Sequence, residues 1–167
     1  MTTKSPKEVF LLLLSEARHN SERATKVFQE INQLVEDPDI KEAIDARVFV
    51  SEKILSQIDQ CFKLLGEKPV ALNSRLQEVF MEDFRRELAD IQSPTARQMF
   101  VLARLSNLVH FRIAEYTALT AIADLTGHFG IGVLLESCLA DTLVFVERTR
   151  RLLRNLIESK VTGRLAA

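Results

Sequence analysis

The stretch that decides the fold is residues 98–125, QMFVLARLSNLVHFRIAEYTALTAIADL. Its apolar residues recur at alternating intervals of three and four, the pattern of a long helix packed into a bundle. The positions that follow this spacing form the seam of the helix: Leu102, Leu105, Val109, Arg112, Tyr116, Leu119 and Ala123. Arg112 alone among them carries a permanent charge. Because a buried guanidinium without a partner costs several kcal/mol, its surroundings decide what the middle of the bundle does.

The same spacing recurs in three further segments and predicts three more long helices, separated by breaks that contain Pro or Gly. Ser5 and Glu8 have the spacing of a capping box at the first helix. Ser74 and Gln77 predict a second capping box, at the start of a shorter helix. The expected helices span about 6–36, 39–65, 74–91, 94–125 and 131–158. No stretch alternates with period two for long enough to make a strand. We therefore predict an all-α fold, a four-helix bundle with one additional shorter helix.

Composition and charge argue against several classes of protein. The 167 residues include 22 basic and 23 acidic side chains, and a net charge of −1 disfavours a general nucleic-acid or acidic-membrane binder. No apolar stretch approaches the length of a membrane span, and the run 9–14 is too short for a signal peptide. Cys61 and Cys138 lack a Cys-x-x-Cys partner, so core packing is their expected role. We expect one domain, residues 1–167, in the cytoplasm.

Three short segments occur together in an order that suggests a family. They are FKLLGEKP at 62–69, IAEY at 113–116 with His110 just before it, and LLE at 134–136. In these segments the chain resembles the YciE/YciF-like family of bacterial ferritin-like proteins, often linked with stress responses, and the resemblance extends from about residue 9 to 156. It implies a ferritin-like bundle with the shorter helix in the crossover between helix pairs. It also implies a homodimer whose biochemical function is poorly defined.

The resemblance implies a di-metal site that this sequence has largely replaced. Ferritin-like di-metal proteins bind their ions through Glu from two helices and Glu-x-x-His from the other two. Glu22 aligns with the first-helix Glu of the family, His110 survives alone in its run, and Asp141 is the acid that remains in the last helix. Arg47 and Ser51 fall where the family carries His and Glu. We therefore expect no metal cofactor; iron or manganese would have Glu22, His110 and Asp141 as its ligands, about half a set.

Polar residues expected near the middle of the bundle form one candidate cluster: Glu22, Arg47, Ser51, His110, Arg112 and Asp141. One hypothesis puts the Arg112 guanidinium in place of the lost metal, paired with Glu22 or Asp141 and with Arg47 on the other side. In the alternative, both arginines extend along the helices to the water at the bundle edge. His110 is either a metal ligand or a core or half-buried histidine. The sequence leaves these alternatives open.

Three classes of function remain. The absence of a nucleophile–base arrangement and of a phosphate-binding glycine loop favours a non-catalytic bundle that acts through self-association or a protein partner. The first alternative is a ferritin-like iron or manganese oxidase or storage protein. The second is a module that binds a small apolar or anionic ligand, anchored by Arg112, Arg47 and His110. Large side chains that either cover a partner or complete the monomer core are Phe80, Met81, Phe84, Phe111 and Tyr116.

Overall fold

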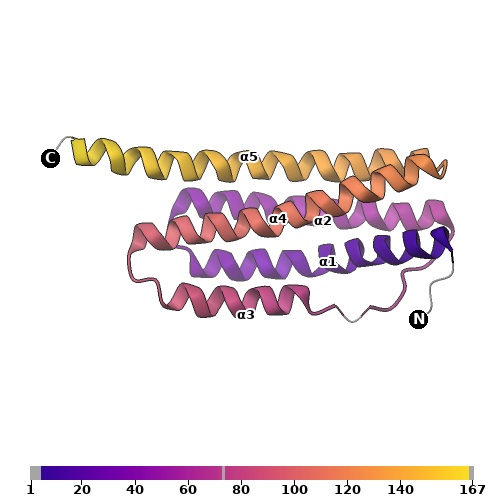
Figure 1. The fold of residues 1–167 in the computed structure, drawn as a ribbon, viewed down its shortest axis with the longest axis horizontal. Helices are drawn as coiled ribbons and strands as arrows, with labels where there is room; N and C mark the ends of the chain where they lie inside the picture. The colour runs from indigo at the N-terminus through magenta and orange to yellow at the C-terminus, as the bar shows by residue number, and fades with distance from the viewer. Residues whose placement is uncertain (1–4, 73, 166–167) are drawn as a thin grey trace.

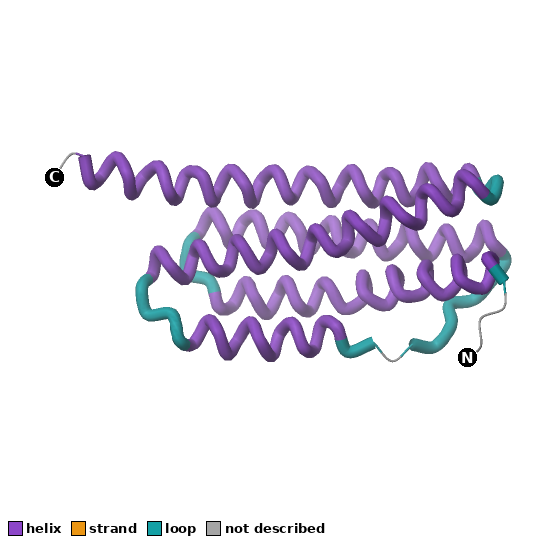
Figure 2. The backbone as a smooth tube through the Cα atoms, in the orientation of Figure 1, coloured by secondary structure: helices purple, strands orange, loops and turns teal. Residues whose placement is uncertain are grey.

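The computed structural model describes residues 5–72 and 74–165, with side chains described as far as residue 159. Within this part of the chain it contains α-helices and no strand (Figures 1 and 2). The helices are α1 Pro6–Leu34, α2 Pro38–Leu65, α3 Leu76–Ala89, α4 Pro94–Leu125 and α5 Phe129–Leu165. The prediction of an all-α bundle with four long helices and one shorter helix is confirmed.

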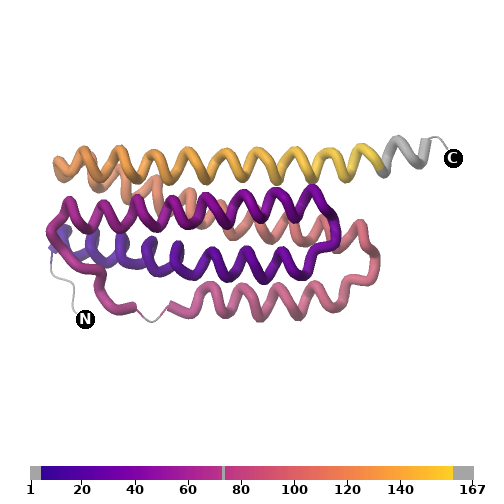
Figure 3. Tube along the Cα trace, turned by 180° about the vertical axis from the view of Figure 1, so that it is seen from behind, coloured from indigo at the N-terminus to yellow at the C-terminus, as the bar shows by residue number. Residues whose placement is uncertain are grey.

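The order of the helices in space explains why the shorter helix is needed. In Figure 1, α2 and α4 run in the same direction, so a tight turn cannot join them. The connection after α2, together with α3, returns the chain along the outside of the bundle to the end where α4 begins (Figures 1 and 3). α1 packs against α2 and α4, α5 packs against the same two helices, and α3 lies on α1 and α4. The predicted crossover role of the shorter helix is confirmed.

Helix ends are set by local hydrogen bonds, most of which the sequence predicts. Ser5 and Glu8 form a reciprocal capping box at α1. The Asp37 side chain accepts from two backbone N–H groups at the start of α2. Gly66 ends α2 with a φ of 68°, a left-handed conformation that glycine adopts without steric cost. These caps explain where α1 and α2 begin and where α2 ends.

The predicted capping box of the shorter helix is wrong. α3 begins at Leu76 after Arg75, and no side chain caps its first turn. Gln77 is buried, and its amide donates to the Asn20 carbonyl oxygen of α1 at 2.7 Å. Gln77 therefore contributes to the packing of α3 on α1. A residue drawn into a contact between helices cannot also bond the N-cap backbone, which is the reason for the error.

α5 is longer than the sequence pattern predicts. It begins at Phe129 and continues to Leu165, past the predicted end near 158, and its last turns project beyond the other helices (Figure 1). Its stretch Phe129–Ser159 is also long enough to span a membrane, and the most apolar 18-residue window in it has a mean hydropathy of 1.8. The prediction that no segment meets this criterion is wrong, although core helices of ordinary bundles meet it too.

The core consists of two apolar clusters separated by a polar layer. One cluster surrounds Phe28 and Phe145, and the other surrounds Leu135 and Tyr116. Large residues proposed for an interface are mostly core residues, because Met81, Phe84 and Tyr116 are buried, whereas Phe80 is half-buried and Phe111 exposed. The polar layer between the clusters takes one or two seam residues from each long helix: Ser21, Arg47, Ser51, Arg112 and Thr142.

Candidate functional site

The hydroxyl groups of the polar layer are satisfied within their own helices. Ser21, Ser51 and Thr142 each donate to the carbonyl oxygen four residues earlier, at 2.7–2.9 Å. Such bonds are the usual solution for a hydroxyl inside a helix. The charge of the layer therefore depends on Arg47 and Arg112, each of which is 3% exposed. The alternative in which both arginines extend to the bundle edge is wrong.

Arg112 forms an ion pair within its own helix. Its Nη1 donates to Oε2 of Glu115, and the two side chains are 4% and 16% exposed. The other oxygen of Glu115 accepts from the side-chain amide of Asn20 on α1 at 2.8 Å. The predicted pairing of Arg112 with Glu22 or Asp141 is therefore wrong. Residues three apart on a helix are neighbours, so the Arg112-x-x-Glu115 spacing was the signal that could have identified this pair.

Arg47 has no ion pair with a carboxylate among the described side chains. Its Nε and Nη1 are buried without a hydrogen bond. Its guanidinium carbon lies 5.6 Å from the ring centre of Phe28 and 5.7 Å from that of Phe145, within the range of cation–π attraction. Burial lowers the pKa of Arg47, and the charge of Arg112 lowers it further. An arginine nevertheless stays protonated in a folded protein, so this cation is held mainly by aromatic faces.

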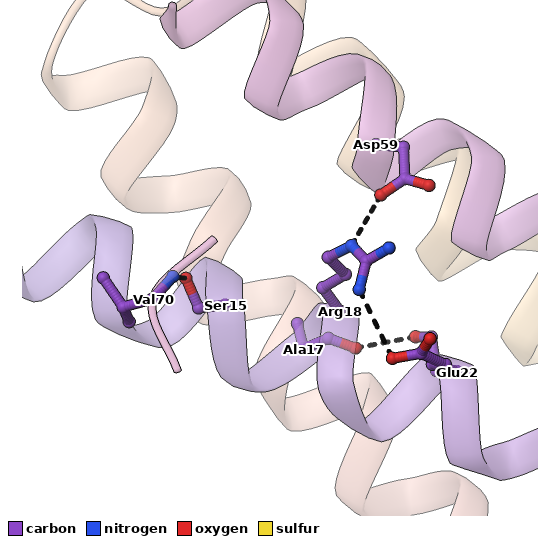
Figure 4. Close-up of polar contacts among 7 residues, drawn as sticks. Ser15, Ala17, Arg18, Glu22, Asp59 and Val70 are labelled. Carbon is purple, nitrogen blue, oxygen red and sulfur yellow. Dashed lines mark hydrogen bonds and ion pairs between the residues drawn. The ribbon is translucent and has the colours of Figure 1, made fainter. Parts of the chain in front are cut away.

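Glu22, predicted to face the centre, lies on the surface of α1. It pairs with Arg18 at 3.3 Å, and Arg18 in turn bonds Asp59 of α2 at 2.6 Å (Figure 4). Glu22 follows the seam residue Ser21 directly. Because one residue advances about 100° around a helix, Glu22 is turned from the core side that Ser21 faces to the surface. The Arg18–Asp59 pair therefore joins α1 to α2 outside the layer.

His110 and Asp141 lie outside the polar layer for the same reason. Each is next to a seam residue, Val109 and Thr142 respectively. His110 is exposed, and its Nδ1 donates to a carbonyl oxygen of the preceding turn at 2.8 Å. Asp141 pairs with Lys53 of α2 at 2.7 Å. Of the six predicted cluster residues, the structure brings together Arg47, Ser51 and Arg112.

Other titratable groups near the layer remain neutral. The Tyr116 hydroxyl is 3.2 Å from the Ser21 hydroxyl, and burial raises the pKa of Tyr116 while Arg112 lowers it. Burial also raises the pKa of Cys138, and that of Cys61, to about 12. A neutral phenol and neutral thiols add no negative charge at pH 7. Sequence reasoning missed Glu115, which compensates Arg112, and Asn20, whose amide donates to Glu115.

The residues of the layer do not fit the di-metal site that the family resemblance implies. Two guanidinium groups occupy the centre, and the carboxylate of Glu115 is already bound by Arg112 and Asn20. Among the described side chains, no group of three or more His, Cys, Asp or Glu residues is placed to hold a metal ion. Hard divalent cations need several carboxylate or imidazole ligands, and fixed cations repel them. The arrangement instead suits negative charge.

Comparisons with known proteins give a family and a fold. The model of a domain of unknown function, DUF892, matches residues 5–166. The crystal structure of the stress protein YciF from E. coli superposes with a TM-score of 0.87 at 19% identity, covering 93% of this chain and 99% of that one. YcfI from Rhodopseudomonas palustris gives 0.83 at 20% identity, covering 88% and 94%. A protein from Xanthomonas campestris gives 0.67 at 17%, covering 93% and 99%. No curated protein matches in sequence.

Proposed function

The chain belongs to the DUF892 family, and we propose that it is a non-catalytic, YciE/YciF-like helical bundle that acts by self-association through α5. Only 33% of the residues in the most apolar stretch of α5 are buried within the monomer, and this observation carries the proposal. An apolar helix face left in water favours association with a second surface. The name of the neighbour YciF, a stress protein of E. coli, supports a role in a stress response in the cytoplasm.

Exposed apolar side chains on and beside α5 mark the surface that we assign to association. Leu125 in the last turn of α4, Phe129, Val133 and Val144 are 65–89% exposed. A two-fold dimer brings one patch against its own copy, so charged residues in the patch would face like charges. Among the exposed positions of α5 between Phe129 and Val144, only Glu136 carries a charge. A second copy of this chain is therefore the partner that we propose.

The non-catalytic part of the proposal is supported by the polar layer. A ferritin-like oxidase needs a cluster of carboxylates, and the layer has two cations in that place. A cysteine nucleophile needs a lowered pKa, whereas burial raises the pKa of Cys61 and Cys138 to about 12. We therefore assign to this centre the role of a degenerate metal site whose ligands were replaced by arginine.

Molar mass in solution tests the self-association directly. We expect light scattering after size exclusion to show a dimer for the wild-type chain. Val133→Glu and Val144→Glu bring charge into the proposed interface and should give monomers with an unchanged helical content. Val79→Glu is the matched control, because Val79 is exposed on α3, away from α5. A monomeric wild-type protein, or equal effects of all three variants, would contradict the proposal. Sedimentation with lipid vesicles would instead assign the face to a membrane surface.

A further inference from the structure

A small enclosed cavity lies in the polar layer, and both arginines line it. Its volume is about 10 Å³, room for roughly one water-sized sphere. The polar residues around it are Ser21, Arg47, Ser51, Gln77, Arg112 and Tyr116. Nε and Nη1 of Arg47 and Nη2 of Arg112 are buried without a hydrogen-bond partner. Two guanidinium groups with unused donors thus border one small space.

The charges around the cavity do not balance. Arg47 and Arg112 bring two positive charges, and Glu115, paired with Arg112, brings one negative charge. No described acidic side chain lines the cavity; Asp141 attracts Arg47 from outside it, but Asp141 is itself paired with Lys53. Tyr116 is neutral at pH 7, because burial raises its pKa. The layer therefore holds a net positive charge in a buried setting, where an uncompensated ion is costly.

We propose that this cavity binds one small monovalent anion, of the size of chloride, between the guanidinium groups of Arg47 and Arg112. The anion accepts hydrogen bonds from the unused donors and supplies the missing negative charge. A water molecule of similar size accepts the same bonds but leaves the charge uncompensated. The amide oxygen of Gln77, which is also buried without a partner, is an acceptor and therefore places the anion on the arginine side of the cavity.

The size of the cavity selects among anions. Chloride and bromide exceed a water molecule by roughly 0.4–0.6 Å in radius, so the lining side chains must move outward slightly to admit them, whereas sulfate, phosphate and organic carboxylates are larger still. The cavity is also enclosed by all the long helices except α5 and by Gln77 of α3. We therefore expect selectivity for halide ions over larger oxyanions, and slow exchange that requires local opening of the bundle.

Thermal unfolding in chloride and in gluconate, at equal ionic strength, tests the site. A ligand that binds only the folded state stabilises it by RT ln(1 + [L]/Kd), so each tenfold rise in chloride above Kd should raise Tm by roughly 3–6 °C. We expect this shift in the wild-type chain and its loss in Arg47→Met. The control is Arg104→Met, since Arg104 also lies over a phenylalanine ring, 5.4 Å from its centre, but on the surface.

The proposal is overturned if the Tm of the wild-type chain does not depend on chloride, or if Arg47→Met retains that dependence in full. A crystal of the wild-type protein grown in sodium bromide gives a second readout that needs no variant. An anomalous peak between Arg47 and Arg112 supports the site. Density with no anomalous signal identifies a water molecule and overturns the proposal. Neither readout depends on self-association, so this inference and the proposed function can fail separately.

Discussion

The two buried arginines of the polar layer have their charges compensated in different ways. Arg112 on α4 and Arg47 on α2 are equally buried, at 3% exposure. Arg112 meets a carboxylate one helical turn away, whereas Arg47 lies against the rings of Phe28 and Phe145. A full negative charge compensates a buried cation more strongly than an aromatic face does. The comparison shows that the cost of a buried charge depends on its partner as well as on its burial.

The largest expected effect comes from removing the partner of Arg112. Glu115→Gln keeps the shape and an oxygen for Asn20 but leaves the Arg112 guanidinium uncompensated. Breaking a buried pair in this way costs about 3 kcal/mol of unfolding free energy, measured by urea denaturation. Asp83→Asn is the matched control, because Asp83 pairs with Arg86 at the same three-residue spacing on an exposed face. We expect the control to cost about 0.5 kcal/mol or less. Equal losses of stability in Glu115→Gln and Asp83→Asn would mean that the pair in the layer contributes no more than a surface pair.

Replacing each arginine should change the free energy of unfolding in opposite directions. In chloride-free buffer, Arg112→Met leaves Glu115 buried without its cation and should cost about 1–3 kcal/mol. Arg47→Met removes an uncompensated cation and should be neutral or stabilising by about 1–2 kcal/mol, because methionine fills similar space and packs against aromatic rings. Urea denaturation of the two variants measures both effects. Similar destabilisation by both would mean that Arg47 has a compensating partner comparable to Glu115.

The pH dependence of stability tests whether a thiolate compensates Arg47. The pKa of Cys138 is raised to about 12, with burial as the main cause, while an unfolded thiol ionises near pH 9. Between these values the unfolded chain has lost a proton that the folded chain keeps. The contribution of this thiol to stability should therefore be unaffected below pH 9 and fall by up to about 1.4 kcal/mol per pH unit above it.

Cys138→Ala should remove the contribution of this thiol to that slope. Cys61 has a pKa raised in the same way, and it retains its own contribution in the variant. Native thiolate absorbance at neutral pH that disappears in Cys138→Ala would show a counter-charge for Arg47. Such a result would mean that Arg47, like Arg112, has a negatively charged partner.

The smallest effects are expected at the acids that the sequence wrongly places in the centre. Glu22→Gln removes an exposed pair with Arg18, and Asp141→Asn removes one with Lys53. Surface pairs of this kind contribute about 0–1 kcal/mol, so thermal or urea unfolding should change little. The chloride dependence of Tm should also be retained in both variants. A loss of stability as large as that of Glu115→Gln would mean that these acids compensate the buried arginines.

The seam spacing predicts the helices and the buried positions because burial repeats with the helical period. Leu105, Arg112 and Tyr116 are buried as that spacing requires. The partners of the charged residues are less predictable, since a side chain one position off the seam can reach the surface or a neighbouring helix. Glu115 is such a residue: it pairs back to Arg112 and bonds Asn20 of α1. Alignment to a metal-binding pattern favoured Glu22 and Asp141, and it did not weigh this local pair.

Elemental analysis of the purified chain tests the central claim, that fixed cations occupy the middle of this bundle in place of a metal centre. Untagged protein is purified without chelators, offered iron and manganese, desalted and measured. We predict far less than one ion per chain, because Arg47 and Arg112 repel divalent cations and the carboxylate of Glu115 is already bound. One or two tightly held ions per chain would contradict this account and make the ferritin-like oxidase the function to test.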